Sequence, residues 1–185
     1  DAALFNGRGG LRFRSGSAGD TNIYRLAANR SCRAHSVFLV FSPAANNNLG
    51  GIWGKSDDDY GIRLQSSAVQ LCGNGNDFAS SGWCYTNGAP GTAFTVGQPL
   101  VVSALAGSPQ TWTTAIGDYW GHTTFRRGYR GDIAEVLVYD RKLDDTERQL
   151  VERHLMAKWL GTLPAPQICV SALPTNTVLN VQQGA

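Results

Sequence analysis

The sequence predicts an all-β fold with a single helix near its C-terminal end, on three observations. Short apolar or alternating runs are separated by turn residues at intervals of about ten, which is typical of many short strands. Charged residues make up only 16% of the chain, so its surface must be covered largely by Gly, Ser, Thr and Asn, as is common in exported β-rich proteins. Helical periodicity is confined to residues 144–160.

The expected strands follow the apolar runs in order. An apolar stretch between two serines predicts a strand over 36–42 that is covered on both faces. Residues 46–51 are expected to form a loop, and Leu4–Phe13 a hairpin around an Asn-Gly-Arg-Gly-Gly turn. The remaining strands are expected at 60–65, 69–71, 100–105 and 133–139.

The helix is expected to begin after Asp144 and to end at Gly161. Asp144 can cap its first turn, and Glu147 lies three residues on, which is the spacing of a capping box. The residues expected to face the sheet are Leu150, Val151, Leu155 and Trp159. Those expected to face solvent are Arg148, Glu152, Arg153 and Lys158.

The chain is expected to form one domain over residues 1–161, followed by a linker and an extra strand over 162–185. Prolines punctuate the second segment before the β-prone run Thr175–Val181. The net charge of +2 is too small to favour nucleic acid as the partner. No apolar run approaches the roughly 20 residues that span a bilayer, so we expect no membrane insertion.

The even number of cysteines, four in a chain rich in Gly, Ser and Asn, predicts two disulfides in an oxidising compartment. No two of them have C-x-x-C spacing, which argues against a zinc knuckle or a redox pair. Three pairings are open. We favour Cys72 with Cys84, which closes a Gly-Asn-Gly-Asn loop, and Cys32 with Cys169, which ties the tail to the body. The alternative is that some are buried free thiols.

A longer motif near the C-terminus carries a resemblance. The run Gly131-Asp-Ile-Ala-Glu-Val136 continues into Tyr139-Asp-Arg-Lys-Leu143, and then into a Glu-Arg-x-x-Val-Glu helix that ends in Lys158-Trp159. This pattern resembles the closing signature of bacterial concanavalin A-like lectin/glucanase domains, also described as laminin-G-like. The similarity covers about residues 2–161 and is specific only in its C-terminal third.

The resemblance implies a fold and a setting. The fold would be a two-sheet antiparallel jelly-roll sandwich with a short amphipathic capping helix, and the setting extracellular or on a bacterial cell surface. Such domains occur in adhesins, in pilus-associated proteins and as accessory modules of carbohydrate-active enzymes. The resemblance leaves the ligand open, because one scaffold hosts many sites.

An enzyme is not favoured. Glycoside hydrolases need paired carboxylates, which glucanase relatives carry as E-x-D-x-x-E or E-x-D-x-E on one strand. The only glutamates here are Glu135, Glu147 and Glu152, in neither pattern. The histidines, at 35, 122 and 154, lack a supporting Gly-x-Ser-x-Gly motif for a triad. An unusual hydrolase site is kept as a minor alternative.

Two loops combine aromatic faces with hydrogen-bonding groups, the mixture that sugar recognition requires. The candidate ligand-binding residues are Asp118, Tyr119, Trp120 and His122 in the first loop, and Asn74, Asn76, Trp83 and Tyr85 in the second. The competing interpretation is that these aromatics only pack over the ends of the fold, and the sequence does not separate the two.

Weaker candidates complete the survey. Asp57, Asp58 and Asp59 are the acidic cluster that could bind calcium, or else form a solvated turn; no other cofactor is indicated. Arginines at 126, 127 and 130 could contact an acidic polymer, but the patch is small. Arg130-Gly-Asp132 spells an integrin-type tripeptide that leads directly into a core strand, and Asn29-Arg-Ser31 is a glycosylation sequon.

The sequence therefore favours a non-catalytic extracellular module that recognises a glycan or another cell-surface ligand in an adhesin or filament protein. The alternative is a structural domain of a pilus-like surface filament, whose tail strand pairs with a neighbouring subunit.

Overall fold

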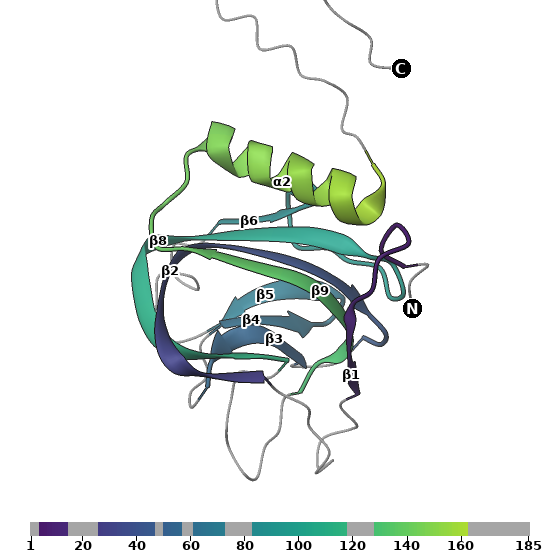
Figure 1. Cartoon of the computed structure of the whole chain (residues 1–185), viewed down its shortest axis with the longest axis horizontal. Coiled ribbons are helices and arrows are strands. Elements are labelled where there is room, and N and C mark those ends of the chain that lie inside the picture. The colour runs from purple at the N-terminus through teal and green to yellow at the C-terminus, as the bar shows by residue number, and fades with distance from the viewer. Residues whose placement is uncertain are drawn as a thin grey trace, which may run out of the picture.

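The computed structural model describes residues 4–14, 26–46, 50–56, 61–72, 83–117 and 128–162, leaving aside the side chains of residues 26–30 and 72. It is mostly antiparallel β-sheet with one helix, which confirms the predicted all-β class (Figure 1). The strands are β1 (Leu11–Arg14), β2 (Leu26–Pro43), β3 (Gly50–Lys55), β4 (Gly61–Gln65), β5 (Ala68–Cys72), β6 (Trp83–Thr86), β7 (Ala89–Pro90), β8 (Leu100–Ile116) and β9 (Arg130–Tyr139); the helix is α2 (Asp145–Leu160).

The nine strands hydrogen-bond into one sheet that folds back on itself. Its order is β1-β9-β2-β8-β3-β4-β5, with β6 paired to β8 and β7 paired to β6. Figure 1 shows β3, β4 and β5 lying beneath the layer formed by β2, β8 and β9, while α2 covers the outer face of that upper layer. The long strands β2 and β8 run through both layers, and they break register between Ala34 and Ser36.

Successive side chains of β2 point alternately into two different hydrophobic cores. Val37, Leu39 and Phe41 point into the core between the layers, whereas Phe38 and Val40 point into a second core beneath the helix. Successive side chains of a strand face opposite sides, so a strand covered on both faces must be apolar throughout. The predicted double coverage of residues 36–42 is thus confirmed.

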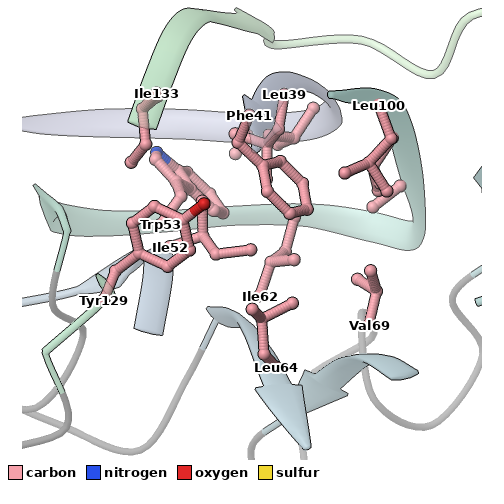
Figure 2. Packing of buried hydrophobic residues seen from close by; sticks show 14 of the residues in the cluster. Leu39, Phe41, Ile52, Trp53, Ile62, Leu64, Val69, Leu100, Tyr129 and Ile133 are labelled. Atoms are coloured by element: carbon pink, nitrogen blue, oxygen red, sulfur yellow. The ribbon is translucent and has the colours of Figure 1, made fainter. Parts of the chain in front are cut away.

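The inter-layer core gathers side chains from both layers. Figure 2 shows Leu39, Phe41 and Leu100 from the upper layer above Ile62, Leu64 and Val69 of β4 and β5. Trp53 of β3 and Tyr129 lie at one end of this core. The centroids of the Trp53 and Trp112 rings are 5.3 Å apart. These aromatic and aliphatic contacts remove a large apolar area from water, which is the main stabilising term for such a fold.

Two expectations about local structure are wrong. Residues 50 and 51 belong to strand β3 rather than to a loop. Farther along the same strand pair, glycines allow close packing: a Cβ at Gly61 would lie 2.6 Å from the Cα of Gly54 on the paired strand. The N-terminal hairpin is reduced to a bridge between Phe5 and Arg8, because Leu11–Arg14 pairs with β9 instead.

The helix has the predicted caps, but the face that it turns towards the sheet differs from the predicted one. Asp144 accepts a hydrogen bond from the Glu147 amide at 2.8 Å, and Gly161 ends the helix in the left-handed conformation at φ 66°. Leu155 and Trp159 are buried as expected, yet Leu150 is 56% exposed. Arg148 and Glu152, expected in solvent, are buried because they pair with each other against the sheet.

Candidate functional site

The β6–β7 hairpin forms one wall of the candidate site. Its turn is Asn87-Gly88, with positive φ at both residues, the conformation that two-residue hairpins favour. Asn87 also joins the hairpin to β8: its amide donates to the Val101 carbonyl at 2.8 Å, and its side-chain oxygen accepts from the Val101 amide at 2.9 Å. The hairpin is therefore held at its turn as well as along the β6–β8 ladder.

A cleft of about 350 Å³ lies between this hairpin and the start of α2, and we call it the Trp83 cleft. It is lined by Trp83, Tyr85, Leu105, Lys142, Leu143, Asp144 and Asp145. The Trp83 side chain is 63% exposed, whereas Leu105 and Leu143 are buried beside it. Clefts with an apolar floor and a few polar groups are typical of small-ligand sites.

Tyr85 is fixed in place by a buried network. The Arg148 guanidinium lies 3.7 Å from the centroid of the Tyr85 ring, and its Nη1 donates to both carboxylate oxygens of Glu152 at 2.7 and 2.6 Å. The Ser103 hydroxyl, from the β8 residue that pairs with Tyr85, donates to the same carboxylate. The network joins α2, β6 and β8, and it covers one face of Tyr85. Of the two predicted aromatics that lie within the described residues, Trp83 is the one with a largely exposed side chain.

The arginines near the cleft are committed to carboxylates. Arg141 forms two hydrogen bonds to Glu147, at 2.7 and 2.6 Å, and Arg148 is paired with Glu152. The Arg141 guanidinium, helped by the Asp144 amide, lowers the pKa of Glu147 to about 2. Among the lining residues, the charged groups are one cation, Lys142, and two carboxylates, Asp144 and Asp145.

All three glutamates have a partner that holds the helix. Glu147 completes the capping box by accepting from the Asp144 amide, and Glu152 accepts from Arg148. Glu135 on β9 accepts from Lys158 at 2.9 Å and from the Trp159 indole N–H in the last helical turn. Burial alone would raise the pKa of Glu135, but these two donors outweigh it and lower the pKa.

The other predicted ligand residues fall outside the described residues: Asn74, Asn76, Asp118, Tyr119, Trp120 and His122. The same holds for the calcium candidates Asp57, Asp58 and Asp59. Within the described ranges, no group of three or more His, Cys, Asp or Glu side chains could hold a metal ion.

The described thiols are not in disulfides. Cys32 and Cys84 are both free, and Cys84 packs against the inter-layer core, where burial raises its pKa to about 12. The structure thus contains neither the Cys72–Cys84 nor the Cys32–Cys169 bridge; Cys169 and the Cys72 side chain lie outside the described residues. A thiol with so high a pKa is almost wholly protonated, and the thiolate is the reactive form.

The Arg-Gly-Asp tripeptide and two of the histidines lie away from the candidate site. Asp132 of the Arg130-Gly-Asp132 tripeptide is 2% exposed, and it accepts from Arg12 at 2.5 Å, so its carboxylate is unavailable to a receptor. His35 is half-buried, with its Nε2 lacking a hydrogen-bond partner, and His154 is exposed on the helix. Neither arrangement is that of a triad histidine, whose ring nitrogens bond to a hydroxyl and a carboxylate.

Sequence reasoning missed the helix side of the cleft. Arg148 and Glu152 have the same helical spacing as Leu155 and Trp159, so all four belong to one face. That spacing could have predicted that Arg148 and Glu152 face the sheet, whereas their charge suggested that they face solvent. Nothing in the sequence indicated that Lys142 and Asp145 would lie opposite Trp83, because this juxtaposition depends on how α2 docks.

Comparison of the chain with family models, with curated proteins and with solved structures finds no match. Within the described ranges, no helix has the length and apolar character needed to cross a bilayer.

Proposed function

We propose that this chain is a non-catalytic module that recognises an extracellular or cell-surface glycan at the Trp83 cleft. One observation carries the proposal: an indole that is 63% exposed stands on a strand anchored to the sheet, beside a cleft of about 350 Å³. A pyranose ring has an apolar C–H face that stacks on such an indole. Its hydroxyls could bond to Lys142, Asp144 and Asp145 on the opposite wall.

The surroundings of Trp83 support a binding role over a purely packing role. Single exposed apolar residues are normal on protein surfaces, but Trp83 borders a concave surface with apolar and charged walls. Binding a ligand there requires little reorganisation, because Arg148 of the helix already packs on the Tyr85 ring of the hairpin and is held there by Glu152. Preorganisation of this kind reduces the entropic cost of binding.

The non-catalytic part of the proposal rests on the glutamates. A glycosidase needs one carboxyl group free to act as an acid and a second as a nucleophile or base. Here Glu135, Glu147 and Glu152 each accept hydrogen bonds that hold α2. In the same proposal, the folded-back sheet is a jelly-roll sandwich of the concanavalin A-like kind, consistent with its two layers and antiparallel ladders.

A glycan array followed by calorimetric titration tests the proposal. We expect specific hits whose affinity falls at least tenfold in Trp83→Ala, with the melting temperature unchanged because the side chain is exposed. Leu150→Ala is the control for loss of an exposed apolar side chain, since Leu150 is 56% exposed but lies on the helix outside the cleft. Trp120→Ala tests the loop that sequence alone suggested. If no glycan on the array binds, or if Trp83→Ala leaves the affinity of the bound glycans unchanged, glycan binding at this cleft is refuted.

The structural alternative is favoured by a different observation. β1 stands at one end of the strand order, and Leu11 within it is 51% exposed. Edge strands invite pairing with another chain. If the domain assembles this way, light scattering will show self-association that rises with concentration and is weakened by Leu11→Lys.

A further inference from the structure

At the N-terminus of helix α2, the protein's own carboxylates occupy the position where an anionic ligand would otherwise bind. A helix N-terminus ordinarily attracts negative groups, because its first amides are unpaired and its dipole is positive there. In this helix the Glu147 amide donates to Asp144, the Asp144 amide donates to Glu147, and Asp145 lies in the first turn. A ligand phosphate, sulfate or carboxylate would therefore meet two negative side chains instead of free amides.

The nearby cations do not offset the negative charge of these carboxylates. Arg141 and Arg148 are each bonded to a glutamate through both carboxylate oxygens, so their charges are locally cancelled. Lys142 is then the single cation among the lining residues, which also include Asp144 and Asp145. Asp145 lines the cleft with its side chain 80% exposed, and its Oδ1 also lies 3.5 Å from Nε of Arg148.

We propose that the Trp83 cleft selects uncharged glycans and rejects sulfated, sialylated or uronic-acid-containing ones through Asp144 and Asp145. This inference rests on the proposed function, since it specifies the ligand class of the same site. The hydroxyls of a neutral sugar donate to the carboxylates and accept from Lys142. An added anion on the sugar meets like charge at short range, and this repulsion weakens its binding.

Matched pairs of oligosaccharides provide the test: a neutral glycan that the array identifies, and the same glycan bearing a sulfate or a uronic acid. We expect the charged member to bind roughly tenfold more weakly at low salt, with the gap narrowing as salt screens the repulsion. Asp145→Asn removes one carboxylate while keeping the shape, and should bring the two affinities together. Asp140→Asn is the control, because Asp140 is an exposed carboxylate outside the lining of the cleft.

The outcomes separate the two proposals. Charged members that bind as well as, or better than, neutral ones through Trp83 would overturn the selectivity and leave glycan recognition standing. A neutral preference that Asp145→Asn does not change would overturn the role given to the carboxylates. If no glycan binds, or if binding ignores Trp83→Ala, the proposed function fails and the selectivity fails with it.

Discussion

Arg148 and Glu152 form an ion pair that is almost fully buried, with Nη1 and Oε2 2.6 Å apart and side chains 4% and 2% exposed. The pair lies between the helix and the sheet, where Ser103 and the Tyr85 ring complete its surroundings. Two charges that most helices place in water are here part of the contact between α2 and the upper layer. Their position behind Tyr85 also makes them the support of the candidate site.

Removing one partner of this pair should destabilise the fold strongly. Arg148→Met leaves the Glu152 carboxylate buried without its cation, and we expect a loss of about 3–5 kcal/mol in the free energy of unfolding. The double variant Arg148→Met/Glu152→Leu should recover most of that loss, because no buried charge is left unpaired. Urea denaturation measures both. Arg141→Met, which breaks the exposed pair with Glu147, is the control and should destabilise the fold much less. A single variant as mild as this control would show that the Arg148–Glu152 pair is solvated.

Acid should remove the contribution of Glu147. Because its pKa is lowered from 4.5 to about 2 in the folded chain, the charged form stabilises the fold above pH 4.5, and this stabilisation is lost as the pH falls towards 2. Glu147→Gln keeps a capping side chain but loses the pair with Arg141. The melting temperatures of wild type and variant should differ near neutral pH and converge below pH 4.5. A difference that is constant with pH would contradict this assignment.

Glu135 should behave as a structural residue. Glu135→Gln keeps an acceptor for the Trp159 indole but removes the charge that pairs with Lys158, so we expect a loss of about 1 kcal/mol. The measurement is thermal or urea unfolding, with parallel assays of glycan hydrolysis. Loss of a hydrolytic activity without any loss of stability would instead establish the hydrolase alternative.

The thiol of Cys84 should be free and unreactive in the native protein. Burial raises its pKa to about 12, so iodoacetamide near pH 8 should modify it only after denaturation. Peptide mapping under non-reducing conditions shows whether Cys84 is a free thiol or part of a disulfide. Recovery of a Cys72–Cys84 peptide would instead establish the disulfide expected from the sequence, and with it a different packing of this strand.

Sequence alone determined two local features of this protein: the doubly covered strand and the ends of the helix. The apolar run 36–42 predicts a doubly covered strand because both faces of β2 must be apolar. The Asp144–Glu147 spacing and Gly161 predict the two ends of α2, since caps depend on residues only a few positions apart.

Only the tertiary structure decided which surfaces meet. Whether Arg148 is solvated or buried depends on a carboxylate one turn away together with Ser103 of a distant strand. Likewise, Trp83 lines the same cleft as Lys142 and Asp145 only because β6 joins the edge of β8 and α2 folds back over it. Such contacts join residues far apart in the chain, and hydrophobic periodicity contains no information about which long-range partners will satisfy a charge or border a cleft.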